Sequence, residues 1–178
     1  MLMVEPCPCS KTKRLKRNME QQSAYKTTFN STEELEGFIG KELGLTTWLT
    51  IDQKRITTFA NVTEDHQWIH LDEEKCAKES PYKSTISHGF LTVSLCAKFM
   101  FEAYEVKDSP MTLNYGMDKV RFPSAIPVDS KCRGRVSLQE FDVTPQGAKY
   151  KLKVLVEVEG AEKPACVAEF LVLMFADS

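Results

Sequence analysis

Long apolar segments and a basic surplus are both missing from this sequence, and each absence excludes a class of protein. No run of eighteen or more apolar residues occurs, so no membrane span is predicted. The amino terminus lacks the basic, apolar and small-residue order of a secretory signal. The formal net charge of −2 argues against a nucleic-acid-binding protein. We therefore expect a cytoplasmic protein with no nucleic-acid partner.

Paired cysteines are missing as well. The six cysteines show neither the spacing of a zinc site nor that of a disulfide framework. Four of them lie among apolar residues, where a reduced cysteine behaves as a small hydrophobic side chain: Cys76, Cys96, Cys132 and Cys166. We predict free thiols.

Residues 1–22 differ in composition from the rest of the chain. They contain five Lys or Arg between Lys11 and Arg17, few large apolar residues and no helical apolar stripe. Such a segment is typical of a solvated tail, although a basic cluster could also serve targeting or a membrane surface. We predict a disordered extension over residues 1–22 and a single domain over residues 23–178.

The local patterns predict both helices and strands. Ser31 suits the start of a short helix, residues 46–51 are β-branched and aromatic enough for a strand, and Asp52 can cap a helix over residues 53–63. Phe90 to Ala97 carries no charge on any face, which predicts a buried helix.

The last third of the chain alternates with period two. Residues 131–138 and 149–158 read as half-buried strands, and residues 165–175 as a more apolar final strand. The pattern indicates an α+β fold, in which a curved antiparallel sheet of about five strands wraps around the long helix. Because such a sheet has exposed edges, we expect a homodimer.

All three histidines of the chain lie between residues 66 and 88, close to two aspartates. His70, Asp72 and His88 could form the two-histidine, one-carboxylate set that suits non-haem iron. Against this reading, His88 begins the apolar helix instead of returning on a strand, so we assign no metal.

Acid and base catalysis by Asp65 and His70 is the second reading. Five helical residues would turn the two side chains about 140° apart, so the intervening residues must leave helical geometry for them to meet. A carboxylate and an imidazole that share one water can remove its proton and return one, without a cofactor.

Structural roles are the third reading of this segment. Asp72 suits the cap of a helix over residues 73–80, and His66 suits an exposed loop. Gly89 either leaves a backbone N–H open to a thioester oxygen or permits tight packing of the helix. Both roles of Gly89 stay open.

A resemblance to a known family favours the second of these interpretations, acid and base catalysis, over the metal site. The stretches FANVTEDHQWIHLDEEKCAKES and TISHGFLTVSL resemble the MaoC-like dehydratase family, the (R)-specific enoyl-CoA hydratases with a hot-dog fold. WLTIDQKRITTFA, DHQWIH and YGMDKVRFPSAIP look closest to its NodN-like branch. The similarity runs from about Leu43 to Arg135.

The resemblance implies a long central helix wrapped by an antiparallel sheet, dimerisation, and reversible hydration of trans-2-enoyl-CoA to (R)-3-hydroxyacyl-CoA without a cofactor. Asp65 and His70 match the family's catalytic pair, and Gly89 matches its oxyanion-hole amide. Many members have glycine in place of Glu64 and Asn-Pro in place of Gln67 and Trp68.

Substrate binding is assigned to Gln67, His88 and Arg121, with Gln67 orienting the loop as the family's asparagine does. The partner would be an acyl-CoA or acyl carrier protein thioester. A basic strip that includes Lys119, Arg121, Lys131 or Arg133 could meet CoA phosphates, although alternating cations on a strand are usually its solvated face. A thioesterase and a non-catalytic thioester-binding protein remain alternatives.

Overall fold

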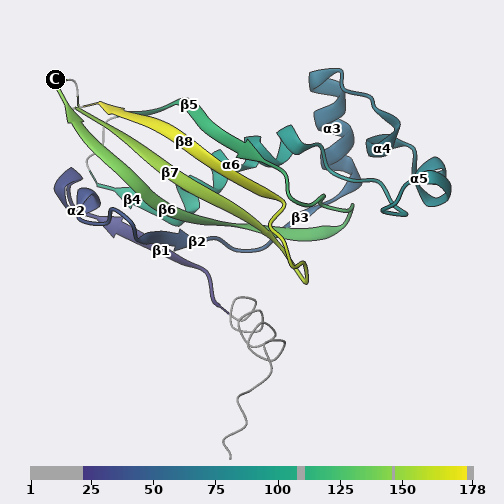
Figure 1. Cartoon of the computed structure of the whole chain (residues 1–178), viewed down its shortest axis with the longest axis horizontal. Helices are drawn as coiled ribbons and strands as arrows, with labels where there is room; N and C mark the ends of the chain where they lie inside the picture. Colours follow the sequence, from purple (N-terminus) through teal and green to yellow (C-terminus); the bar gives the residue numbers. More distant parts are fainter. Residues whose placement is uncertain (1–21, 108–110, 146, 176–178) are drawn as a thin grey trace, which may run out of the picture.

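The computed structural model describes residues 22–107, 111–145 and 147–175 (Figure 1). The extension predicted over residues 1–22 lies outside the described residues except for Gln22. The Gln22 carbonyl accepts a hydrogen bond of 2.9 Å from Arg133 Nη1. Among the described residues there is no helix with the length and hydropathy that a bilayer span requires.

One long helix and a large sheet make up most of the molecule, in the following order: β1 (Tyr25–Phe29), α2 (Thr32–Glu36), β2 (Glu42–Leu45), β3 (Leu49–Ile51), α3 (Gln53–Thr63), α4 (Trp68–Leu71), α5 (Glu73–Glu79), α6 (Gly89–Ala103), β4 (Tyr104–Val106), β5 (Met111–Arg121), β6 (Ser130–Thr144), β7 (Gly147–Val158) and β8 (Cys166–Phe175).

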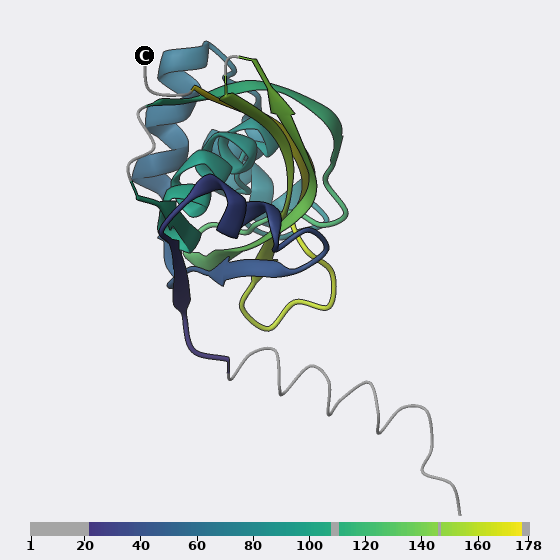
Figure 2. The same ribbon diagram turned by 90° about the vertical axis from the view of Figure 1, so that its left-hand side faces the viewer.

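The sheet curves around α6, as Figure 2 shows, so the predicted α+β architecture is confirmed. Its strands follow the order β4-β1-β2-β6-β7-β8-β5, and β3 pairs with β6. The antiparallel meander of β6, β7 and β8 is confirmed by their registers. Along β7 every second residue is buried, because the inward side chains pack on α6 while the outward ones meet solvent.

The expectation of about five strands is wrong, because the described residues form an eight-stranded sheet. Three of the additional strands, β1, β2 and β4, have five residues or fewer. β5 is long, yet most of its side chains are exposed. A strand exposed on both faces shows no alternation of apolar and polar residues, so its sequence carries no period-two signal. The strand predicted over residues 46–51 is also shorter and covers only Leu49–Ile51.

The sequence predicts that helix α6 is buried on every face, but the structure shows one exposed stripe. Phe90 and Phe101 are 71% and 72% exposed, and Ser94 is exposed between them. These positions are four and seven residues apart, about one and two helical turns, and therefore form one stripe along the helix. The edge strand β5 leaves this stripe uncovered in a single chain.

Two glycines let the sheet approach α6 closely. A Cβ at Gly44 would lie 2.1 Å from the carbonyl oxygen of Ala103, and one at Gly134 would lie 2.4 Å from Phe99 Cβ. Neither position has space for a larger residue, so the helix sits against the backbone of β2 and β6.

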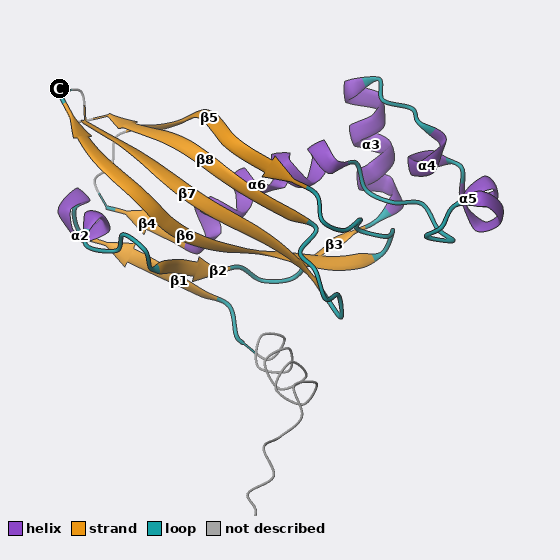
Figure 3. Ribbon diagram, in the orientation of Figure 1, coloured by secondary structure: helices purple, strands orange, loops and turns teal. Residues whose placement is uncertain are grey.

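Helices α3, α4 and α5 lie together at the end of the sheet where α6 begins (Figure 3). Asp52 caps α3 by accepting a hydrogen bond of 2.8 Å from Arg55 N, and Asp72 caps α5 in the same way through Lys75 N, as predicted. The segment that contains Asp65, His66 and His70 connects these helices.

Candidate active site

The chain leaves helical geometry directly after α3. Glu64 ends that helix in the left-handed conformation, with φ 60° and ψ 17°. Residues 65–67 are not helical, and Gln67 precedes the short helix α4. The chain between Asp65 and His70 therefore leaves helical geometry, as is required for the two side chains to meet. A positive φ also explains why glycine suits the position of Glu64, since glycine adopts this conformation without steric cost.

The surroundings of His70 favour its neutral form. Its Nδ1 lies 2.7 Å from the carbonyl oxygen of Ile86, which can only accept, so Nδ1 carries the hydrogen and Nε2 keeps its lone pair. Burial lowers the pKa of His70 below its ordinary value, and the neighbouring His88 lowers the pKa further. The hydrogen bond to Ile86 and the charge of Asp65 oppose this shift without reversing it.

Gln53 fixes the backbone around His70 and is not among the residues predicted from the sequence. Its Nε2 donates to the carbonyl of His70 at 2.8 Å, and its Oε1 accepts from Thr85 Oγ1 at 2.6 Å. One amide therefore connects α3, α4 and the segment before α6. A single glutamine in the first turn of a helix gives no signal in the sequence, because its partners are 17 and 32 residues away.

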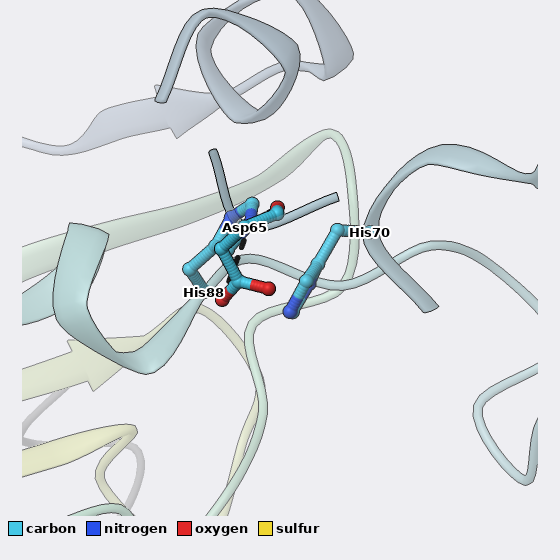
Figure 4. A group of neighbouring side chains, drawn as sticks. All are labelled: Asp65, His70 and His88. Atoms are coloured by element: carbon cyan, nitrogen blue, oxygen red, sulfur yellow. Dashed lines mark hydrogen bonds and ion pairs between the residues drawn. The ribbon is translucent and has the colours of Figure 1, made fainter. Parts of the chain in front are cut away.

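His88 lies behind the catalytic candidates and contacts both (Figure 4). Its Nε2 is 3.0 Å from the carbonyl oxygen of Asp65, and its ring stacks on that of His70 with 3.6 Å between centroids. His88 is 2% exposed, and its buried Nδ1 has no hydrogen-bond partner among the described residues. These contacts position Asp65 and His70 relative to each other.

Asp65 presents its carboxylate to the same gap as the His70 imidazole, as Figure 4 shows. The Asp65 side chain is 55% exposed, and Oδ2 lies 4.0 Å from His88 Nε2. Gln67, in contrast, contributes its backbone: its carbonyl accepts from His70 N at 3.0 Å, and its exposed side chain makes no cap hydrogen bond. His66 is an exposed loop residue, as predicted.

A cavity of about 340 Å³ opens beside His70 and Gly89. Its wall is largely apolar and includes Ile69, Tyr82 and Phe122. Gly89 is the first residue of α6, where a backbone N–H has no partner within the helix. A Cβ at Gly89 would lie 3.1 Å from the Phe122 ring, so the absence of a side chain also permits this close packing.

A divalent cation could find ligands at this site. One ligand atom from each of Asp65, His70 and His88 lies within 4.8 Å of the others. Coordination by His88 Nε2 would break its hydrogen bond to the Asp65 carbonyl. The set considered from the sequence included Asp72 in place of Asp65, and the structure shows instead that Asp72 caps α5.

Of the basic strip proposed from the sequence, Arg133 is buried, whereas Lys119, Arg121 and Lys131 are exposed. Arg133 is 2% exposed, because its Nε lies 2.8 Å from Glu157 and its guanidinium lies over the Trp48 ring at 4.3 Å. Lys119 and Lys131 pair with carboxylates on neighbouring segments at 3.5 and 3.6 Å. Arg121 is exposed and donates through Nη1 to the carbonyl of Val120.

Comparison with known proteins agrees with this architecture. Residues 34–160 match the model of the MaoC like domain. The chain is 42% identical over 146 residues to 3-hydroxyacyl-thioester dehydratase Z of Mycobacterium tuberculosis, covering 82% of this chain and 96% of the relative. It is 40% identical over 151 residues to nodulation protein N of Rhizobium leguminosarum bv. viciae, covering 83% and 92%.

A solved structure confirms the hot-dog fold. The unliganded R-hydratase PhaJ1 from Pseudomonas aeruginosa superposes with a TM-score of 0.64 and 19% identity, covering 78% of this chain and 83% of that one. The family model and the sequence relatives show that the chain belongs to the MaoC-like dehydratase family.

Proposed function

We propose that the chain catalyses the reversible hydration of trans-2-enoyl thioesters to (R)-3-hydroxyacyl thioesters, as a single domain over residues 23–178. The observation that carries the proposal is that the Asp65 carboxylate and the His70 imidazole face one gap beside the amino terminus of α6. The thioester would be carried by CoA or by acyl carrier protein. The (R) configuration is proposed from the similarity to an R-hydratase.

The geometry suits addition of water to an activated double bond. A water between Asp65 and His70 gives a proton to the free Nε2 of His70, and its oxygen bonds to the β-carbon. The electrons of the double bond move onto the thioester oxygen, which the Gly89 N–H stabilises as an enolate. The α-carbon then takes up a proton from the pair, so that H and OH have added across the double bond. Gln53 and His88 hold the pair in place.

Loss of enoyl absorbance on mixing the purified protein with crotonyl-CoA and longer trans-2-enoyl-CoAs tests the proposal. Chiral analysis of the product should give the (R) alcohol. Release of free thiol from acyl-CoA would instead indicate a thioesterase, and binding of acyl-CoA without turnover would indicate an accessory binding protein. Unchanged absorbance with both CoA and carrier-protein substrates would rule out a hydratase.

We also propose that the enzyme is a homodimer. β5 is an edge strand, and the exposed stripe of α6 lies beside it: Phe101 lines one pocket with Met111 of β5, and the Phe90 ring lies 6.3 Å from the ring of Phe122, directly after β5. Exposed contiguous apolar surface of this kind marks an interface, and a second copy would cover both the strand edge and the helix. The free buried cysteines fit a reducing compartment such as the cytoplasm.

The Phe101→Glu variant should therefore be a monomer, because the substitution places a charge within the proposed interface. Light scattering at several protein concentrations measures the mass. Val143→Glu is the matched control, since Val143 is 74% exposed on β6, which is three strands away from the edge strand β5, and it should remain dimeric. A monomeric wild-type protein, or a dimeric Phe101→Glu variant, would contradict the proposed interface.

A further inference from the structure

A second cavity, of about 530 Å³, lies along α3 and reaches Leu91 of α6. On α3 it is lined by side chains that share one helical face, among them Arg55, Thr58 and Phe59. None of the residues assigned above to catalysis or substrate binding lines this cavity. Its wall combines apolar surface with cationic and hydroxyl groups.

Arg55 is a half-buried cation without a counter-ion. Within residues 22–107, 111–145 and 147–175, its guanidinium makes no ion pair, and its buried Nε has no hydrogen-bond partner. Burial of a charged group without a partner is unfavourable. A planar guanidinium presents paired donors that match the oxygens of a phosphate group.

The position of the cations in α3 is also unfavourable for the helix itself. Lys54 and Arg55 occupy its first turn, where the helix dipole favours negative charge, and no acidic residue lies in that turn. The nearby Asp52 carboxylate lines the same cavity, but it is engaged in capping the helix through Arg55 N at 2.8 Å. A bound anion would offset both the burial of unpaired Arg55 and the repulsion between these cations and the helix dipole, because it would face two cations and the positive end of the helix.

The cavity adjoins the catalytic site. The Phe59 ring in its wall lies 5.1 Å from the His88 ring, and His88 in turn contacts the Asp65 carbonyl. Gly89 and Leu91, two residues apart in the first turn of α6, line the catalytic cavity and the α3 cavity respectively. The first turn of α6 therefore lies between the two cavities, and a carrier arm that passes around this turn would reach Arg55.

We propose that Arg55 and Lys54 bind a phosphate group of the substrate's carrier, the part shared by CoA and by the phosphopantetheine of an acyl carrier protein. This inference rests on the proposed hydratase function and identifies which end of the substrate the α3 cavity takes.

Steady-state kinetics with three crotonyl thioesters test the inference: crotonyl-CoA, crotonyl-phosphopantetheine and crotonyl-pantetheine, which has no phosphate. Arg55→Gln should raise KM for crotonyl-CoA about tenfold, the loss expected for one charge-assisted hydrogen bond, and leave kcat within about twofold. KM for crotonyl-pantetheine should not change. If Arg55→Gln also raises KM for crotonyl-phosphopantetheine, Arg55 binds the phosphate of the pantetheine arm. If it raises KM for crotonyl-CoA alone, Arg55 binds a phosphate of the nucleotide.

Calorimetric binding of CoA itself gives a readout that does not need turnover. Arg55→Gln should weaken CoA about tenfold, Arg55→Lys less, and Lys153→Gln, which removes a cation from the outer face of β7, not at all. If the protein hydrates no thioester but binds CoA through Arg55, the function proposed above fails and the phosphate site stands.

Two results would overturn the inference. Equal losses for pantetheine and CoA thioesters would show that Arg55 only supports packing, and Arg55→Met, which keeps the aliphatic stem, should then restore binding. Wild-type kinetics and CoA binding in Arg55→Gln would show that Arg55 is a solvated cation.

Discussion

Asp65→Asn and His70→Gln should each lower kcat for hydration by about 10²–10⁴-fold, the usual contribution of a positioned acid or base. Asparagine cannot take up a proton, and the glutamine amide has no basic lone pair in place of His70 Nε2. The two residues act on one water, so the double variant should lose little more than either single variant. Enoyl absorbance under saturating substrate measures kcat.

His66→Gln is the matched control, since His66 lies one residue from Asp65 and its Nε2 contacts only the side chain of Asn61, at 3.3 Å, among the described residues. It should keep kcat within about twofold, because surface substitutions away from special features have small effects. Circular dichroism should show that all variants are folded. Near wild-type turnover in Asp65→Asn or His70→Gln would remove that residue from the mechanism.

Gly44→Ala should destabilise the fold by about 3 kcal/mol or more, the upper range for overpacking. The added Cβ would lie 2.1 Å from the carbonyl oxygen of Ala103 and 2.7 Å from its carbonyl carbon. These are backbone atoms at the end of α6, so the clash can be relieved only if the helix and β2 move apart. Denaturant unfolding, at a fixed protein concentration because the protein is expected to be dimeric, measures the free energy.

Gly37→Ala is the control for this prediction. Gly37 has φ −61° at the end of α2, and the nearest atom to an added Cβ is the carbonyl oxygen of Glu34, at 3.4 Å. Alanine adopts this conformation readily, so the variant should be as stable as wild type or more stable by about 0.4–1 kcal/mol. An unchanged free energy of unfolding for Gly44→Ala would mean that α6 does not pack so closely on β2.

Local features of the fold could be predicted because neighbouring residues alone determine them. Asp52 and Asp72 cap their helices through amides three residues away. The alternation of residues 149–158 identifies the buried face of β7 without reference to any other strand. β5 could not be predicted in this way, since its pairing with β8 and not its own pattern makes it a strand.

Reasoning from the sequence was sufficient to predict the α+β class, the capped helices, the meander of β6 to β8 and, through the spacing of Asp65, His70 and Gly89, the family. The contacts of His88 with Asp65 and His70, the link that Gln53 makes between α3 and the backbone of His70, the burial of Arg133 and the place of Arg55 in a cavity became visible only in three dimensions. Burial, stacking and ion pairing depend on segments distant in the chain, and sequence spacing does not encode them.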